Sequence, residues 1–324
     1  MYEPLQVLAI KHLDEHVVEN SRSGGVFTAI SDYVLQQNGV VYGCVLDDNR
    51  IAKHIRVDNE EGRNKMRGSK YVQSDLGESF LNIEKDLKVK RKVLFSGTAC
   101  QVEGILSYLE NRNIDIENFI TIEILCHGVP SPMIWQENLA WVEKKYKHRI
   151  CNVDFRNKKK YGWKRHVETY TFNNNEEFDS GLYTKLFTRH FILRPSCYVC
   201  PFKGKAKRAD ITIADFWGIE KVSLEMNDDK GTSLVLVNSK KGLQYIKQVE
   251  KQLWCISTEI ENAIQPPLVA PFPCPTNRDK FWQDFNKKGY DFVLKKYADY
   301  SVKQRILDSL PYCIRNVLRT RKKS

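Results

Sequence analysis

Long apolar runs are missing from this 324-residue sequence. No stretch approaches the roughly 18 to 20 apolar residues that a helix needs to cross a bilayer. The first residues, Met-Tyr-Glu-Pro-Leu, also lack the basic, apolar and small-residue order of a signal peptide. Hydrophobic residues make up 42% of the chain and charged residues 28%, which is typical of a globular protein with a sizeable core. We therefore expect a soluble, cytoplasmic protein.

The sequence also lacks the even number of cysteines that is typical of a disulfide-bonded protein. The nine cysteines are an odd number in a long chain without an export signal, and they lie at positions 44, 100, 126, 151, 197, 200, 255, 274 and 313. In such a chain thiols stay reduced or bind metal. The sequence therefore predicts thiols, metal ligands or both in place of disulfides.

Acidic residues are the scarcer charge. The chain has 51 Lys and Arg against 40 Asp and Glu, a formal net charge of +11. This surplus favours an acidic protein partner, a phosphate-bearing ligand, nucleic acid or an anionic membrane surface. Charge alone does not distinguish among these four.

Strands alternate with helices in the first half of the chain. The expected elements are a turn at 21–25, helices over 26–37 and 101–110, and strands over 40–46, 93–96 and 119–125. The helices rest on apolar residues spaced for one face and on turn residues at their ends. The alternation predicts an α/β fold of mixed sheets with flanking helices, with functional loops at the strand ends.

The pattern loosens after about residue 150. The expected elements there are strands over 151–155, 166–172, 211–214 and 233–238 and a helix over 240–252. Five prolines between 265 and 275 exclude regular structure, and the last stretch reads as a helical C-terminal region. We therefore divide the chain into regions 1–150, 151–264 and 265–324.

The strongest local motif is Cys197-Tyr-Val-Cys200. Two thiols three positions apart can point at one metal centre, but they supply only half of a four-thiolate set. Cys100 follows the turn after one predicted strand, and Cys126 follows the next strand. If these strands are neighbours in a sheet, both thiols emerge at one edge. Four thiolates suit a 4Fe–4S cluster and structural zinc alike.

Other interpretations of the cysteines stay open at this point. Four-cysteine zinc sites usually contain two close pairs, whereas here two single residues precede one pair. With zinc, the chain would be a zinc-stabilised binding module with a basic surface for nucleic acid or a protein partner. A lone Cys-x-x-Cys can also be a redox pair or two unrelated thiols. The expected bystanders are Cys44, Cys151, Cys255, Cys274 and Cys313.

Six blocks, from about Ser21 to about Gly242, resemble the coenzyme F420 hydrogenase/dehydrogenase beta-subunit family, which includes 7-hydroxymethyl chlorophyll a reductase. The blocks are Ser23-Gly24-Gly25-Val-Phe-Thr-Ala, Arg67-Gly68-Ser69-Lys70-Tyr71-Val-Gln-Ser, Phe95-Ser-Gly97-Thr98-Ala99-Cys100-Gln101, Cys126-His127-Gly128, Cys197-x-x-Cys200 and Ala209-Asp210-Ile-Thr-Ile-Ala-Asp215-Phe-Trp217-Gly218. One block alone is a weak signal, but six in the family's order are specific.

The resemblance implies an FAD and a 4Fe–4S cluster at the strand ends. The implied cluster ligands are Cys100, Cys126, Cys197 and Cys200. In archaeal relatives the flavin passes a hydride to a deazaflavin-type coenzyme, and bacterial relatives often belong to polysaccharide gene sets. We therefore expect a flavin-dependent iron–sulfur oxidoreductase that passes electrons between the cluster and FAD and, as hydride, to a small organic acceptor. Region 1–150 would bind the flavin, and region 151–264 would complete the cluster site.

Two departures from the family pattern concern the cluster. Many members begin with a ferredoxin-like domain, whereas no cysteine precedes Ser21 here. Further clusters would then belong to an acidic electron carrier, such as a ferredoxin, or to a separate iron–sulfur subunit. The family's Gly-Thr-Pro-Cys is Gly97-Thr98-Ala99-Cys100, which loosens the turn and keeps the thiol.

Several blocks contain residue types that suit a flavin nucleotide. Glycines at a helix N-terminus let backbone N–H groups approach a pyrophosphate, although an ordinary glycine turn has the same pattern. The basic, hydroxyl and aromatic residues at 67–71 suit phosphate and flavin contacts, with a solvated basic loop as the alternative. The expected cofactor-binding residues are Ser23, Gly24, Gly25, Ser69, Lys70, Tyr71, Gly97, Thr98 and Asp215.

Lys70 and His127 are the candidate catalytic residues. The Lys70 ammonium would stabilise a reduced, anionic flavin. His127, next to Cys126, would shuttle a proton near neutral pH, with a core-capping histidine as the alternative. Asp210 and Asp215 flank a predicted strand, where a carboxylate bonds a cofactor hydroxyl or simply caps the strand.

Basic residues gather in three further segments. Lys203, Lys205, Lys207 and Arg208 follow the Cys-x-x-Cys, where positive charge would raise a cluster's potential and steer an acidic carrier. In 156–165, aromatic residues interleave as in a nucleic-acid surface, but no nucleic-acid-binding motif accompanies them, and we do not expect nucleic-acid binding. The basic, amphipathic tail at 301–324 suits packing on its own domain or peripheral contact with an anionic membrane.

Overall fold

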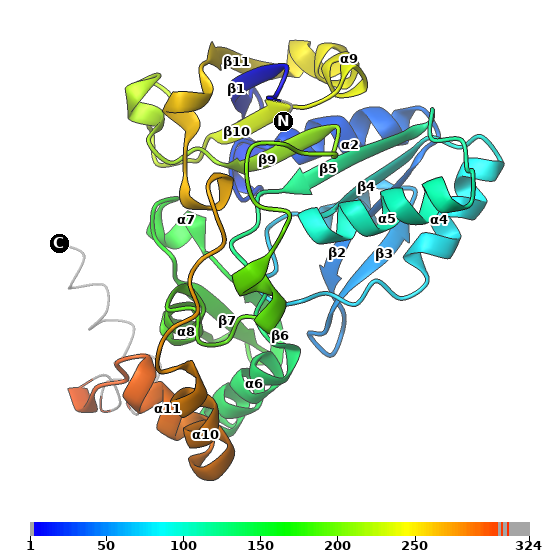
Figure 1. The fold of residues 1–324 in the computed structure, drawn as a ribbon. Helices are drawn as coiled ribbons and strands as arrows, with labels where there is room; N and C mark the ends of the chain where they lie inside the picture. Colours follow the sequence, from blue (N-terminus) through cyan, green and yellow to red (C-terminus); the bar gives the residue numbers. More distant parts are fainter. Residues whose placement is uncertain (1–2, 304–305, 307–309, 311–324) are drawn as a thin grey trace. The chain divides into compact units, whose positions relative to one another are not determined.

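The computed structural model describes residues 3–303, 306 and 310 and divides the chain into two compact units (Figure 1). Unit 1 contains the residues up to Val129, Lys158–Arg165 and Pro195–Phe272. Unit 2 contains Pro130–Asn157, His166–Arg194 and the chain from Pro273. These boundaries do not coincide with the divisions expected near 150 and 264, because the middle of the chain contributes to both units.

Unit 1 is built on an eight-stranded mixed sheet. In spatial order its strands are β11 (Leu253–Thr258), β1 (Gln6–His12), β10 (Ser233–Val237), β9 (Ile211–Asp215), β5 (Phe119–Ile124), β4 (Val93–Thr98), β2 (Val40–Leu46) and β3 (Ala52–Val57). The four strands β9, β5, β4 and β2 run parallel, and the others pair antiparallel. The central strands β4 and β5 are buried along most of their length, as expected where both faces are covered.

Helices and short segments cover both faces of this sheet. They are α1 (Glu15–Glu19), α2 (Val26–Gln36), α3 (Glu60–Asn64), α4 (Ser79–Lys88), α5 (Ala99–Asn111), α7 (Lys158–Tyr161), α9 (Lys240–Val249) and the 3-10 turns Pro195–Val199, Ile219–Lys221, Glu250–Gln252, Ile260–Ala263 and Pro266–Leu268. Apolar residues of α2 and α9 pack on one face. On the opposite face, α4 and α5 cover β2, β4 and β5, while irregular segments cover β1 and β10.

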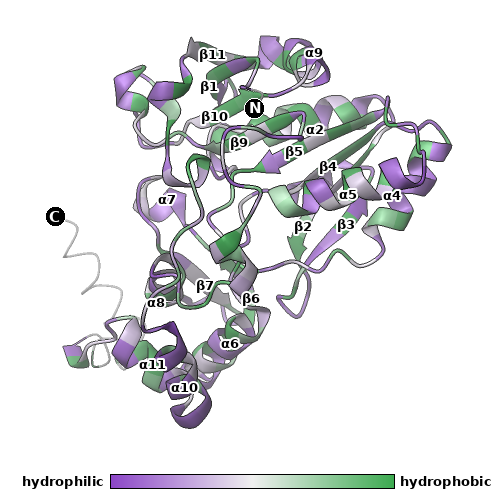
Figure 2. Cartoon of the chain, in the orientation of Figure 1, coloured by the Kyte–Doolittle hydropathy of each residue, from purple (hydrophilic) through white to green (hydrophobic). Residues whose placement is uncertain are grey.

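In the described residues of unit 2, a small antiparallel sheet is combined with four helices. The strands are β6 (Ile150–Asp154), β7 (Glu168–Phe172) and β8 (Glu177–Ser180), and the helices are α6 (Pro132–Tyr146), α8 (Leu182–Thr188), α10 (Arg278–Lys288) and α11 (Tyr290–Tyr297). Its core is aromatic, with Trp135 packed against Phe155 and Tyr183. Hydrophilic residues dominate α10 (Figure 2).

The expected fold class is confirmed. The structure is a mixed α/β protein with flanking helices, and α10 and α11 form the expected helical C-terminal region. No helix among the described residues is long and apolar enough to cross a bilayer. Most of the basic tail at 301–324, including Cys313, lies outside the described residues, so its predicted membrane contact stays a prediction.

Candidate functional site

The predicted site residues gather at the carboxyl edge of the parallel strands of unit 1. Thr98 at the end of β4 pairs with Ile124 at the end of β5, and β9, which ends at Asp215, is the next strand. The loops with Cys100 and Cys126 therefore leave the sheet on the side where β9 ends. This is the edge at which open α/β sheets place their ligands.

The four predicted cluster ligands lie near one another at this edge. Cys126 interacts electrostatically with Cys100 and Cys197, and Cys197 interacts with Cys200. Burial raises the pKa of Cys126 to about 12, while the charge of Lys203 lowers it. Burial is also the main cause of the raised pKa of Cys197. Thiols in this setting need a neighbouring cation or metal centre to bind as thiolates.

Four thiols from three segments match the donor set of an iron–sulfur cluster. Each thiolate of a 4Fe–4S cluster binds a different iron, so its sulfurs stand farther apart than the ligands of a single ion. Within the part of the chain that the structure describes, no three His, Cys, Asp or Glu side chains form a group that could hold one metal ion. Four thiolates suit a 4Fe–4S cluster and structural zinc alike.

Three basic residues that follow the Cys-x-x-Cys motif make polar contacts within unit 1. Lys203 donates to the carbonyl oxygen of Cys126. Lys207 forms a 2.7 Å ion pair with Glu123 of β5, in which each side chain is only 3% exposed. Arg208 pairs with two glutamates of α5. Three of the four cations expected to steer an acidic carrier therefore pair with groups of this chain. The sequence analysis did not single out Glu123, although a carboxylate within an apolar strand indicates a buried charge that needs a partner.

The Ser-Gly-Gly turn is bonded to the ends of neighbouring strands. The Ser23 hydroxyl lies 2.9 Å from Asp215 Oδ1, and the Gly24 N–H donates to the Ser233 hydroxyl over 2.9 Å. A Cβ atom on Gly24 would lie 2.0 Å from the Ile10 carbonyl oxygen. Close packing against β1 therefore requires a glycine at position 24, and the N–H group of this glycine is already bonded to Ser233.

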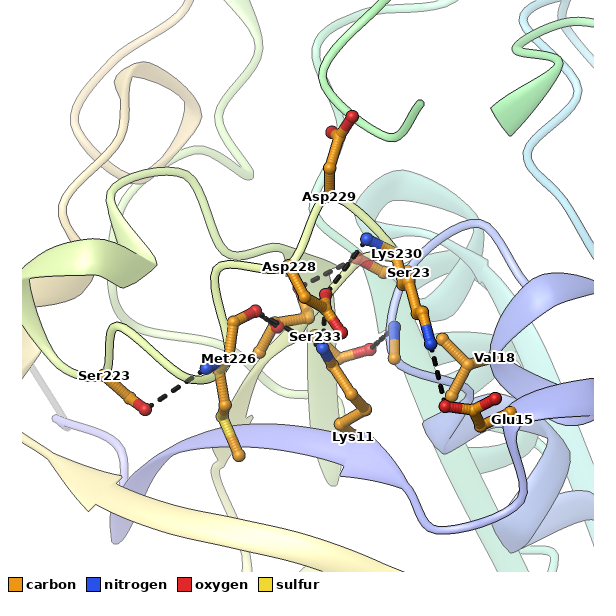
Figure 3. A network of polar contacts seen from close by, with 12 residues as sticks. Lys11, Glu15, Val18, Ser23, Ser223, Met226, Asp228, Asp229, Lys230 and Ser233 are labelled. Atoms are coloured by element: carbon orange, nitrogen blue, oxygen red, sulfur yellow. Dashed lines mark hydrogen bonds and ion pairs between the residues drawn. The ribbon is translucent and has the colours of Figure 1, made fainter. Parts of the chain in front are cut away.

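The segment 223–233, which completes this corner, has its own polar network (Figure 3). Lys11 of β1 binds Asp228 over 2.7 Å, and Lys230 binds Glu15 over 2.7 Å. The Lys11 side chain is only 9% exposed, so its pairing with a carboxylate offsets the desolvation of the ammonium group. The network holds Ser233 next to the glycine turn.

Buried donors without a partner surround the N-terminus of α2. Gly25 precedes the helix with a left-handed φ of 91°. Two buried atoms close to this glycine, Ser21 Oγ and His12 Nε2, have no hydrogen-bond partner among the described residues. A Cβ atom on Gly25 would lie 3.1 Å from that of His12 and 3.6 Å from Ser21 Oγ. An anion at this helix end would meet the helix dipole and such donors, and the sequence analysis had singled out neither Ser21 nor His12.

The loop at 67–71 is structured by its lysine. Lys70 Nζ donates to the carbonyl oxygens of Lys65 (2.9 Å) and Arg67 (3.0 Å). Burial raises the pKa of Cys44, and the charge of Lys70 opposes that rise. Burial, with a smaller contribution from the charge of Lys70, lowers the pKa of His54 to about 4. Lys70 therefore lies close to β2 and β3 and does not extend into solvent as in a disordered basic loop.

Ser69 and Tyr71 flank Lys70 in this loop, and both are half-buried. Gly68 before them has a left-handed φ of 76°. This conformation favours glycine and turns the chain ahead of the two side chains. Their contact with a flavin stays a prediction.

The turn after β4 is a capping box. The Thr98 N–H donates to Gln101 Oε1 over 2.9 Å, and Thr98 Oγ1 lies 3.3 Å from Cys100 Sγ. A Cβ atom on Gly97 would lie 2.9 Å from both Gln101 and the Phe95 ring. The turn therefore holds an exposed Cys100 thiol in the first turn of α5.

His127 stacks on Phe272 of the same unit, with ring centroids 4.0 Å apart and planes 26° apart. A half-buried ring packed in this way has the contact expected of a core-capping histidine. Its position next to Cys126 also keeps it beside the thiols. The predicted proton transfer by His127 stays a prediction.

Asp215 and Asp210 occupy opposite ends of β9. Asp215 accepts a hydrogen bond from Trp163 Nε1 (3.1 Å), whereas Asp210 accepts from Thr121 at the amino end, as a strand cap would. Trp163 is 1% exposed and stacks on Trp217 with centroids 4.8 Å apart. A buried indole cannot stack on a nucleic-acid base, so Trp163 has no such role, whereas Tyr161 in the same segment is half-buried.

The fold and the site define an α/β protein with a group of thiols at the carboxyl edge of its sheet. Over residues 90–262 the chain matches a family described as the C terminus of the coenzyme F420 hydrogenase/dehydrogenase beta subunit. This match covers more than half of the chain, so the chain belongs to that family. The family places it among subunits of redox enzymes.

One solved structure similar to this chain is described as a xenon derivative of the F420-reducing NiFe hydrogenase complex from Methanosarcina barkeri. The identity is 16%, the match covers 94% of this chain and 95% of that chain, and the TM-score is 0.54. At this identity the likeness shows the fold alone. No curated protein matches the chain.

Proposed function

We propose that this protein is an iron–sulfur flavoprotein oxidoreductase. It passes electrons between a 4Fe–4S cluster and FAD and, as hydride, to a small organic acceptor. The observation that carries the proposal is the gathering of Cys100, Cys126, Cys197 and Cys200 at the sheet edge that also holds Asp215. Family membership supports a redox role.

The proposed cluster ligands have cationic support. When bound, the cluster handles single electrons and the flavin pairs them. The ammonium of Lys203 lowers the pKa of Cys126 and Cys197, in opposition to burial, so it favours the thiolate form of both ligands. The same charge would raise the potential of an anionic cluster.

The pyrophosphate of FAD would lie at the N-terminus of α2. There it would meet the N–H groups of the first helical turn and the buried donors Ser21 and His12. Ser23 and Gly24 would shape this corner through their bonds to Asp215 and Ser233.

The flavin ring would contact the two loops on the other side of the site. Ser69, Lys70 and Tyr71 form one of these loops, and Gly97 and Thr98 form the other. Lys70 would hold its ammonium near the electron-rich part of the ring. His127 would move the proton that accompanies hydride transfer.

The proposed acceptor is a deazaflavin-type coenzyme or a polysaccharide-pathway metabolite. The proposed electron partner is a ferredoxin or a separate iron–sulfur subunit, in the cytoplasm. A subunit partner is supported by the structural neighbour, which belongs to a hydrogenase complex.

Anaerobic purification of the chain tests the proposal. We expect brown-yellow protein with flavin bands near roughly 370 and 450 nm over a thiolate–iron shoulder, and about four irons per chain. The Cys197→Ser variant should lose most of its iron. The control Cys151→Ser changes an exposed cysteine of unit 2 and should retain it. Colourless protein with one zinc per chain would instead favour the zinc-stabilised binding module.

A further inference from the structure

A chain of hydrogen bonds links the 67–71 loop to the Cys100 turn. His54 Nε2 lies 3.0 Å from the Ser96 carbonyl oxygen, and His54 Nδ1 lies 3.1 Å from Ser74 Oγ. Gln101 Nε2 lies 2.9 Å from Ser74 Oγ. The Oε1 atom of the same Gln101 caps the turn whose threonine touches Cys100.

The direction of each hydrogen bond follows from donor chemistry. A carbonyl oxygen only accepts, so Nε2 of His54 donates to Ser96. In a neutral imidazole the other nitrogen then accepts, so the Ser74 hydroxyl donates to Nδ1. That uses the only hydroxyl proton of Ser74, and its oxygen accepts from the amide of Gln101. The sequence of donors and acceptors in this hydrogen-bond network therefore fixes the tautomer of His54 and the orientation of the Gln101 amide.

These hydrogen bonds connect four segments that are separate in sequence. His54 belongs to β3, Ser74 ends the segment that begins with the 67–71 loop, Ser96 belongs to β4, and Gln101 to α5. Backbone bonds of Asp75 to β3 fix the end of the loop, with His54 N–H donating to Asp75 over 2.8 Å. His54 and Ser96 are buried, where hydrogen bonds are strengthened and hard to replace with water.

Helix capping accounts for only half of the contacts of Gln101. A capping box needs an acceptor at the third helical position, and glutamate supplies it as well as glutamine. Only the amide can also donate to Ser74. This second contact is the one that reaches the 67–71 loop.

We propose that Ser74 and Gln101 are positioning residues that fasten the 67–71 loop to the Cys100 turn. This inference deepens the proposed function and rests on it, because these two segments are the proposed contacts of the flavin and the cluster. The link would hold the bound flavin and the bound cluster at one fixed distance from each other. Neither side chain is assigned a contact with a cofactor or a reacting atom.

The isosteric variant Gln101→Glu tests the proposal. It retains the cap acceptor and removes the donor to Ser74. The single Ser74 proton then faces two acceptors, the new carboxylate and His54 Nδ1, so one of the two bonds of Ser74 is lost and the link is broken. In cofactor-free protein we expect amide hydrogen exchange of residues 67–73 to rise at least about threefold over wild type, while exchange in α5 is unchanged. The Kd of the variant for FAD should be about tenfold higher than that of wild-type protein, the loss of one good hydrogen bond.

Three variants complete the experiment. Ser74→Ala should reproduce the faster exchange, and Ser74→Thr, which keeps the hydroxyl, should restore the wild-type rate. Gln37→Glu makes the same charge change at an exposed position after α2 and should alter neither readout. Unchanged exchange at 67–73 in both Gln101→Glu and Ser74→Ala would overturn the inference. Failure of wild-type protein to bind FAD would overturn the proposed function, while the exchange measurement would still decide the coupling.

Discussion

At the scale of the residue, the sequence revealed which residue types form the site better than it revealed what each one contacts. Cys100, Cys126 and Asp215 were predicted at strand ends, and the sheet places them there. The same reasoning let the N–H groups of the two glycines approach a phosphate, with an ordinary glycine turn as the alternative, and the structure bonds the Gly24 N–H to Ser233. A partner more than 200 positions away cannot be read from a local pattern.

Gly24 carries a prediction at this scale. The Gly24→Ala variant should lower the free energy of unfolding by about 2 to 3 kcal/mol, because its Cβ would lie 2.0 Å from the backbone of Ile10 and the strand cannot move aside. Urea denaturation measures the change. The control Gly181→Ala, whose Cβ would lie 3.9 Å from its nearest neighbour, should change stability by less than about 1 kcal/mol. Equal losses in both variants would contradict the packing argument.

At the scale of the element, periodicity located the parallel core and missed the outer strands. The strands β2, β4, β5 and β9 were predicted nearly as found. Two outer strands, β1 and β3, contain a buried Lys11 and a buried His54, so their sequences do not read as clean apolar patterns. Helix α6 was also missed, although Ile134, Leu139 and Val142 line its buried face.

The ion pair between β5 and the segment after the Cys-x-x-Cys belongs to this scale. The Glu123→Gln variant would leave the ammonium of Lys207 buried without a countercharge, and should cost about 3 to 5 kcal/mol of stability. Replacing both residues with apolar ones, Glu123→Leu with Lys207→Met, should recover most of that loss. Urea denaturation of the wild type, both single variants and the double variant measures the coupling. Additive losses would show that the two side chains do not depend on each other.

At the scale of the whole molecule, two buried groups respond to pH in opposite directions. In unit 2, burial raises the pKa of Glu168 to about 7. Between pH 4.5 and 7 the folded chain keeps a proton that the unfolded chain releases, so stability falls as the pH rises. In unit 1, burial lowers the pKa of His54 to about 4. There the unfolded chain binds the extra proton between pH 6.5 and 4, so stability falls as the pH falls.

Glu168→Gln separates these two effects. The glutamine resembles the protonated acid that accepts from Tyr183 and contacts Thr184, so the variant should lose the decline in stability between pH 4.5 and 7, about 3 kcal/mol in total. The loss on acidification that comes from His54 should persist. Calorimetric unfolding at several pH values across this range checks both statements. An unchanged decline in the variant would contradict the assignment to Glu168.

The placement of β1 has a consequence for synthesis. This strand precedes every other described strand in the sequence, yet both of its neighbours, β10 and β11, follow it by more than 200 residues. It has no sheet partner until residue 237, the end of β10, has emerged from the ribosome. Translation therefore leaves this apolar strand unpaired until then, and a fragment ended at residue 150 would present the same unpaired edge to other chains.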